Sequence, residues 1–232
     1  MTIEENYRRI LNEVRAAEER SGRTAGSVRI VGVTKTVGRA AVERSYAAGL
    51  RDFGENRVQD AKEKFTPPIA PDTQLHLIGY LQTNKARDAA ALFDTIHSVD
   101  RPELIQVLEH RAAAINKTLK ILIQVNIAAE EQKHGCEPAA AEALVQQTVD
   151  CPHLEIRGLM TIAPLVADQE AARPVFRALR DLRDRIASVD PRFKLPELSM
   201  GMTNDFVSAI EEGATMVRIG RAIFLNKIVW DM

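Results

Sequence analysis

Hydrophobic residues recur along this chain in two alternating patterns. Short, mostly apolar runs indicate buried strands, and longer stretches with apolar residues at helical spacing indicate helices. The expected strands are Ser27–Thr34, Arg51–Phe53, Gln74–Ile78, Thr95–Ser98, Leu119–Asn126, Glu155–Ile162, Glu197–Met200 and Met216–Ile219. The expected helices between them include Ala40–Gly49, Glu55–Phe65, Thr83–Phe93, Pro102–Asn116, Pro138–Val149, Gln169–Ala187 and Asn204–Glu212.

A further helix is expected before the first strand. Its apolar residues at helical spacing are Ile3, Tyr7, Ile10, Leu11, Val14 and Ala17. Thr2 and Glu5 are spaced as a capping box, and Ser21 and Gly22 mark the end of the helix. The pattern predicts a helix that packs one face on the body of the protein.

Strict alternation of strands and helices predicts a parallel sheet with helices on the crossovers. The run Leu119–Asn126 is mostly apolar, as a strand covered on both sides must be. Eight such units in about 200 residues predict an α/β protein, a single (β/α)8 TIM barrel with an extra N-terminal helix, over residues 1–232 as one domain. The alternative is an open doubly wound sheet, although no Gly-x-Gly-x-x-Gly follows the first strand.

Charge and composition exclude several classes of protein. The chain of 232 residues has 31 Lys and Arg against 32 Asp and Glu, so bulk electrostatics gives no reason to expect nucleic acid as a partner. No apolar run approaches the roughly 18 residues of a membrane span, and the acidic start does not resemble a secretory signal, so we expect a cytoplasmic protein without a membrane partner. Cys136 and Cys151 signal neither a disulfide framework nor a metal site.

Candidate chemistry lies where the expected strands end, because that face of a barrel carries the functional residues. Lys35 follows the first strand, and two interpretations compete for it. It is either a cation paired with a carboxylate at the mouth, or a lysine that forms a Schiff base with a carbonyl compound. Glu55 and Asn56 follow the second strand, where the simplest role for them is to cap the start of a helix.

The seventh and eighth strands each run into a glycine and then a helix start, at Gly201 and Gly220. Such turns direct backbone N–H groups outward, and the loops after these two strands frequently form a phosphate site. The alternative is that both glycines only serve tight turns. Lys35 together with a phosphate site matches a ligand with both an aldehyde and a phosphate, such as pyridoxal 5′-phosphate, or a sugar phosphate on a Schiff-base aldolase.

The residues also carry a family resemblance. The matching segments are VTK (33–35), FGENRVQ (53–59), HLIGYLQTNK (76–85), IRGLM (156–160), LSMGMTND (198–205) and MVRIGRAIF (216–224). With these segments in this order, the chain resembles the pyridoxal-phosphate homeostasis proteins, also called the YggS/PROSC family, whose domain is like the N-terminal domain of alanine racemase.

The resemblance implies a role for each of several residues toward pyridoxal phosphate. Lys35 would carry the cofactor as a Schiff base, Asn56 would lie beside its ring, and Arg218 would face the pyridine nitrogen. The phosphate would be held by Ser199 and Thr203 with backbone groups around Gly201, Met202, Gly220 and Arg221. The family often has Ser before the lysine and a smaller or uncharged residue after Arg-Ile-Gly, whereas this chain has Thr34 and Arg221.

We expect a carrier of pyridoxal phosphate in vitamin B6 homeostasis, without significant catalysis and acting as a monomer, with pyridoxal-phosphate-dependent apoenzymes as candidate partners. The chain ends after its eighth unit, so we expect no second domain to supply an acid or base, and an always-protonated Arg218 cannot accept a pyridinium hydrogen as Asp would. The alternative is a weak amino-acid racemase, for which Tyr80 is the first residue to suspect.

Other marked residues fit simpler roles. We expect His76 to be a hydrogen-bonded structural histidine, and Lys133 and His134 to lie in a polar loop on the mouth side. The arginines between positions 173 and 185 alternate with aspartates, which favours a solvated helix face over an RNA-binding surface.

Overall fold

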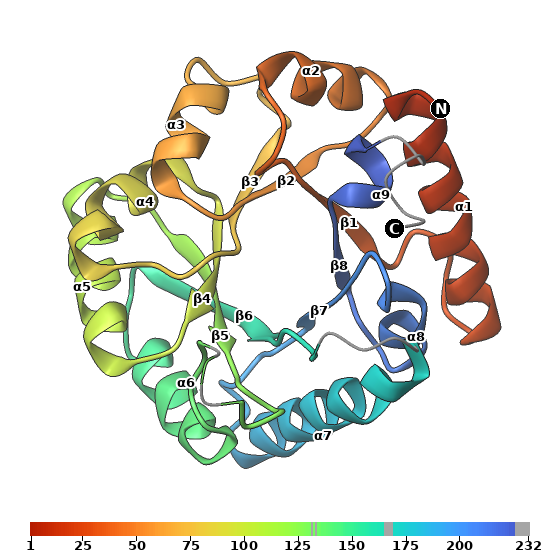
Figure 1. Ribbon diagram of the computed structural model, residues 1–232. Coiled ribbons are helices and arrows are strands. Elements are labelled where there is room, and N and C mark those ends of the chain that lie inside the picture. The colour runs from red at the N-terminus through yellow and green to blue at the C-terminus, as the bar shows by residue number, and fades with distance from the viewer. Residues whose placement is uncertain (131, 133, 165–168, 226–232) are drawn as a thin grey trace.

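A closed barrel of parallel strands forms the centre of the molecule (Figure 1). The computed structural model describes residues 1–130, 132, 134–164 and 169–225. The strands are β1 (Arg29–Val33), β2 (Asp52–Glu55), β3 (Gln74–Leu77), β4 (Thr95–Val99), β5 (Leu119–Gln124), β6 (Leu154–Met160), β7 (Glu197–Met202) and β8 (Met216–Ile219). They follow one another around the barrel in chain order.

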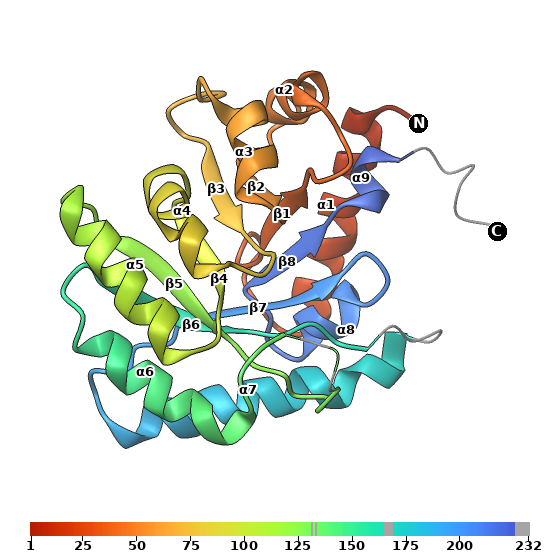
Figure 2. The same ribbon diagram turned by 60° about the vertical axis from the view of Figure 1, so that its left-hand side comes forward.

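Helices surround this barrel on the outside (Figures 1 and 2). The α-helices are α1 (Ile3–Arg20), α2 (Arg39–Ala47), α3 (Val58–Phe65), α4 (Ala86–Leu92), α5 (Pro102–Ala114), α6 (Ala141–Val149), α7 (Arg173–Val189), α8 (Phe206–Glu211) and α9 (Arg221–Phe224). Short 3₁₀ turns are η1 (Thr83–Lys85), η2 (Pro138–Ala140) and η3 (Gln169–Ala172).

Parallel pairing of β1 with β8 closes the barrel and decides between the two predicted architectures. The register runs from Arg29 beside Met216 to Gly32 beside Ile219. An open doubly wound sheet has no such pair, so the (β/α)8 barrel is confirmed and the alternative is wrong.

The N-terminal helix is also confirmed, with its predicted boundaries. The Thr2 hydroxyl accepts from the backbone N–H of Glu5, the Glu5 side chain accepts from that of Thr2, and Ser21 caps the other end. Helix α1 lies beside α8 and α9, and the side-chain amide of Asn6 donates to the carbonyl of Ile223 at 3.1 Å. Because α9 is only four residues long, α1 covers the part of the barrel that a longer eighth helix would cover.

Most predicted elements differ from the observed ones only at their ends. The first turns of three expected helices are 3₁₀ turns, namely η1, η2 and η3. The helix predicted at Glu55–Phe65 begins only at Val58, because Glu55 is still the last residue of β2.

Two apolar cores hold the barrel and its helices together. The larger core fills the layer between strands and helices and includes Phe53, Phe93 and Phe176, all fully buried. The smaller core lies among the strands and contains Val31, Leu122, Met160 and Met216. The buried polar residues Glu55, His76, His97 and Ser199 lie on other strands of the barrel.

Candidate functional site

A cavity of about 660 Å³ opens at the carboxyl ends of the strands. Its described lining comes from the ends of β1, β5, β7 and β8 and from the segments that follow β1, β2, β3, β5, β6, β7 and β8. This is the face at which barrels of this architecture carry their functional residues, and the volume suits a small-molecule ligand. The lining residues named in the sequence analysis are Lys35, Asn56, Tyr80, His134, Met202, Thr203, Arg218, Gly220 and Arg221.

Lys35 lies in the turn that follows β1, with an exposed side chain that lines the cavity. The residue before it, Thr34, is fully buried and tied to a buried ion pair. The Thr34 hydroxyl donates to Oε1 of Glu55 at 2.6 Å, and the Lys64 ammonium donates both to that oxygen and to the Thr34 carbonyl, each at 2.8 Å. These hydrogen bonds hold the backbone at the end of β1 in place, directly before Lys35.

The capping role expected for Glu55 and Asn56 is wrong. Helix α3 is preceded by Arg57, and no side chain caps it. Glu55 is the last residue of β2, and its buried carboxylate forms an ion pair with Lys64. Asn56 instead lines the cavity, two residues before the helix.

The loops after β2 and β3 touch each other at the cavity wall. A Cβ placed on Gly79 would lie 2.3 Å from the carbonyl oxygen of Asn56, far inside van der Waals contact. Only glycine fits there, and its absent side chain lets the loop carrying Tyr80 approach Asn56. The position of Asn56 therefore depends on a residue of the neighbouring loop.

Arg218 lies on β8 with its guanidinium at the cavity and only 4% of the residue exposed. One terminal nitrogen donates to the Ser199 hydroxyl at 2.6 Å, and the other donates to the Thr161 carbonyl at 2.8 Å. Burial lowers the pKa of Arg218 to about 10, and nearby Asp205 opposes that effect. At neutral pH the side chain is a fixed cation held at two points.

The loops after β7 and β8 bring further predicted residues to the cavity. Between β7 and β8 the register shifts, and the pairing of Met202 with Arg218 sets the end of β7 beside the guanidinium. Gly220 packs on the end of β1, where a Cβ would lie 3.2 Å from the Val33 carbonyl. Thr203 and Arg221 line the cavity next to these two contacts.

Two of the predicted phosphate residues lie elsewhere among the described residues. Ser199 is fully buried below the cavity, where its hydroxyl contacts Arg218 and His97. Gly201 is also outside the cavity lining and has a positive φ of 91°, and a Cβ there would lie 2.5 Å from that of Ala209. Gly201 therefore lets the end of β7 pack closely against α8.

Asp205 is a cavity residue that the sequence analysis missed. Its carboxylate accepts from the backbone N–H of Met202 at 2.5 Å, and burial raises its pKa. The Met202 N–H, which was expected to help bind phosphate, thus has a partner within the protein. The sequence offered one signal for it, since Asp205 follows Gly201 and directly precedes the helix that begins at Phe206.

At the rim, the ring of Tyr80 contacts two basic side chains. Its ring lies parallel to that of His134, with centroids 4.1 Å apart, and the Arg101 guanidinium lies 4.9 Å from its centroid on the ring face. Tyr80 and His134 both line the cavity, so the predicted mouth-side place of His134 is confirmed. Lys133 lies outside the described residues.

The charge of the lining favours an anionic ligand. Lys35, Arg218 and Arg221 bring cations to the cavity, and Asp205 is the carboxylate among its described lining residues. A primary amine, a buried guanidinium and the N-terminus of a short helix together can bind a ligand that carries both a carbonyl group and an anionic group.

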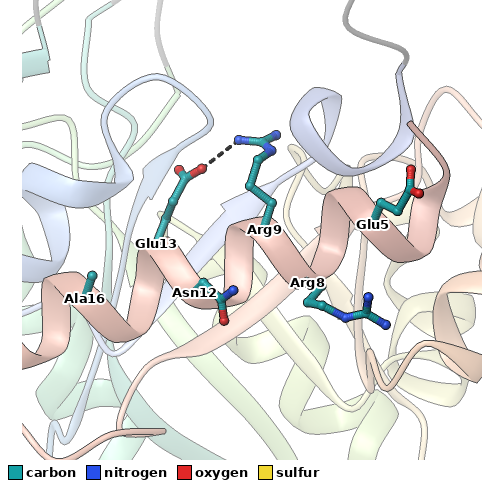
Figure 3. A pocket seen from close by; sticks show the side chains of 6 residues that line it. All are labelled: Glu5, Arg8, Arg9, Asn12, Glu13 and Ala16. Atoms are coloured by element: carbon teal, nitrogen blue, oxygen red, sulfur yellow. Dashed lines mark hydrogen bonds and ion pairs between the residues drawn. The ribbon is translucent and has the colours of Figure 1, made fainter.

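Other hollows offer less chemistry. One hollow on the outer surface is lined by residues of α1 alone, namely Glu5, Arg8, Arg9, Asn12, Glu13 and Ala16 (Figure 3). Arg9 pairs with Glu13 at 2.7 Å and Glu5 completes the capping box, so these side chains stabilise helix α1 itself. In the part of the chain that the structure describes, no group of His, Cys, Asp and Glu side chains could hold a metal ion, and no helix is both long and apolar enough to cross a membrane.

Comparison with known proteins adds a family to this geometry. Residues 6–227 match the family model described as alanine racemase, N-terminal domain. A protein of Aquifex aeolicus named pyridoxal phosphate homeostasis protein is 41% identical over 220 residues, which cover 95% of this chain and 96% of that protein.

Two solved structures extend the comparison. PipY of Synechococcus elongatus, determined with PLP bound, is 38% identical with a TM-score of 0.79, over 91% of this chain and 99% of that one. An alanine racemase of Clostridium difficile, 14% identical with a TM-score of 0.76, shares the fold over 95% of this chain and 56% of its own length.

Proposed function

Since the chain belongs to the family of pyridoxal phosphate homeostasis proteins, we propose that it binds pyridoxal 5′-phosphate as a Schiff base on Lys35 and acts as a carrier of that cofactor. The observation that supports the proposal most directly is that Lys35, Arg218 and the loops after β7 and β8 line one cavity. The PLP-bound relative agrees with this choice of ligand.

The residues of the cavity fit the cofactor group by group. When bound, pyridoxal phosphate supplies an aldehyde that condenses with an amine, with loss of water. Lys35 is the amine, and Asn56 lies on the neighbouring loop, where it would contact the ring. Arg218 would hold the pyridine nitrogen by donating to it, because a guanidinium has only hydrogens to offer.

The phosphate would bind at the loops after β7 and β8. Thr203 offers a hydroxyl, and the start of α9, after Gly220, lies beside it at the cavity. Arg221 adds a positive charge at the same place. This assignment leaves out Ser199 and Gly201, which lie behind the cavity wall, and the Met202 N–H, which donates to Asp205.

The carrier proposal further holds that the bound cofactor is stored and handed to apoenzymes with little turnover of amino acids. Its support is the cation at Arg218, since a ring nitrogen that accepts from a guanidinium stays unprotonated and withdraws electrons weakly. The proposal takes residues 1–232 as one domain and a monomer as the working unit, because loops of one barrel form the mouth. Light scattering coupled to size-exclusion chromatography tests whether the protein is a monomer.

A weak amino-acid racemase is the second candidate, and Tyr80 is the observation that favours it. Its phenol lines the cavity and is 42% exposed, so it can reach a ligand as an acid or base. Exchange of the α-proton of alanine in deuterated water separates the two candidates. We expect exchange no faster than with free cofactor, and rapid, saturable exchange that is lost in Tyr80→Phe would support the racemase.

Reduction with borohydride tests the Schiff base. The protein loaded with pyridoxal phosphate should absorb in the visible range, and borohydride should fix a pyridoxyl group on the peptide that contains Lys35. Lys35→Ala should lose both signals, whereas Lys85→Ala, an exposed lysine of η1, should keep them. A label mainly on another lysine, or an unchanged spectrum in Lys35→Ala, contradicts the assignment.

Pyridoxal without its phosphate tests the anion site. Each charge-assisted hydrogen bond lost is worth about 1.5–3 kcal/mol, so pyridoxal should bind at least about tenfold more weakly than its phosphate. Equal affinities would remove the case for the loops after β7 and β8.

A further inference from the structure

A continuous chain of hydrogen bonds leads from Arg218 through the barrel to β2. Arg218 donates to the Ser199 hydroxyl at 2.6 Å, and Oγ of Ser199 lies 2.9 Å from Nδ1 of His97. Nε2 of His97 lies 2.9 Å from Nδ1 of His76, and Nε2 of His76 lies 3.0 Å from a carboxylate oxygen of Asp52. Strands β4 and β7 are not neighbours, so the contact of His97 with Ser199 crosses the barrel interior.

Burial makes this chain costly to leave incomplete. Ser199 and His97 are fully buried, and His76 is 1% exposed. A polar atom without a partner at such a depth costs about 1–3 kcal/mol. Burial above all, and also the positive charges of Arg218 and Arg29, keep the pKa of His97 well below its usual value, so its ring is neutral at pH 7.

With a single hydrogen on each histidine ring, one arrangement of hydrogens satisfies every link. A guanidinium only donates, so Ser199 accepts from Arg218, and its own hydrogen is available for Nδ1 of His97. His97 then carries its hydrogen on Nε2 and donates to Nδ1 of His76. His76 in turn donates from Nε2 to the Asp52 carboxylate. With neutral rings, the reverse arrangement would set a lone pair of His76 against a carboxylate.

We propose that Ser199, His97, His76 and Asp52 are positioning residues that hold the Arg218 guanidinium in one orientation at the cavity. The proposal rests on the proposed function, in which Arg218 faces the ring nitrogen of pyridoxal phosphate. The bond to the Thr161 carbonyl holds one terminal nitrogen, and the chain holds the other. Without the chain, the guanidinium is free to turn toward Asp205, the carboxylate that lines the same cavity.

The protein without ligand tests the chain directly. Long-range ¹H–¹⁵N spectra of the wild type at pH 7 should show His97 as a neutral ring with its hydrogen on Nε2, and a hydrogen on Nε2 of His76 that is donated to Asp52. The Nη signals of Arg218 should be separate, because two hydrogen bonds hinder rotation of its guanidinium. A hydrogen on Nδ1 of His97, or averaged Nη signals, would overturn the proposal without any variant.

Two serine variants then test the link to the cofactor. Ser199→Ala removes the middle of the chain, and Ser98→Ala is the matched control, because Ser98 is equally buried on β4 and its hydroxyl has no partner among the described residues. Ser199→Ala should average the Arg218 Nη signals, shift the visible absorption of the bound cofactor and weaken its binding at least about tenfold. Ser98→Ala should leave all three unchanged.

The outcomes separate this inference from the proposed function. If the wild type binds pyridoxal phosphate and Ser199→Ala matches Ser98→Ala in spectrum and affinity, the positioning role is refuted. If the wild type leaves the cofactor unbound, the proposed function fails, and the tautomers and the Arg218 signals alone then decide whether the chain orients the guanidinium.

Discussion

Replacing Lys64 by Met should destabilise the protein far more than replacing a surface lysine would. Lys64 is 13% exposed in its side chain and pairs at 2.8 Å with Glu55, whose side chain is fully buried. Methionine keeps the packing of the lysine stem but removes the ammonium. The Glu55 carboxylate then keeps only the Thr34 hydroxyl as a donor, since its second oxygen has no partner among the described residues.

Removing one partner of a buried ion pair costs about 3–5 kcal/mol, because the remaining charge keeps its desolvation cost without compensation. We expect a loss of this size for Lys64→Met, because the buried Glu55 carboxylate then keeps a single hydrogen-bond donor among the described residues, the Thr34 hydroxyl.

Urea unfolding followed by circular dichroism measures this difference. With an m value near 3 kcal/mol per M, the midpoint of Lys64→Met should fall by about 1 M at pH 7. Lys62→Met on the same helix is the control, because Lys62 and Asp88 form a pair with side chains 43% and 32% exposed and should be worth less than about 1 kcal/mol. Equal losses in the two variants would refute the reasoning.

Three further predictions concern the loops, the histidines and the cysteines. Gly79→Ala should cost about 2 kcal/mol or more and weaken cofactor binding, because its Cβ meets the Asn56 backbone, while Gly38→Ala, with open space around it, should cost no more than about 1 kcal/mol in a urea titration. His97 has a lowered pKa in the folded protein, so it contributes stability fully above about pH 6.5 and loses it as the pH falls; His97→Gln should reduce the slope of stability against pH by up to about 1.4 kcal/mol per unit below that point. Burial raises the pKa of Cys136 to about 12, so a thiol reagent should modify the half-buried Cys151 first and reach Cys136 only when urea unfolds the protein; equal rates in the native state would contradict this.

Local patterns in the sequence were sufficient to predict the fold class and many of the residues at the mouth of the barrel. Alternating strand and helix patterns, the capping box at Thr2 and the positions of Lys35 and Gly220 are local properties, set by side-chain periodicity and by the residues directly after each strand. The carboxyl ends of parallel strands all lie at one end of the barrel. Residues that directly follow the strands in the sequence could therefore be placed at this mouth without knowledge of their contacts. Lys35, Asn56, Thr203 and Arg218 all line the cavity as a result.

Which of these residues face the cavity and which lie behind its wall follows from long-range contacts. Ser199 and Glu55 look like mouth residues in the sequence, yet one supports Arg218 inside the barrel and the other is buried against Lys64. Their partners are 19 and 9 positions away in the chain, and the contact of His97 with Ser199 spans 102. Such pairings depend on strand register and on closure between β1 and β8, and no local pattern encodes them, because they arise only when distant strands meet around one interior.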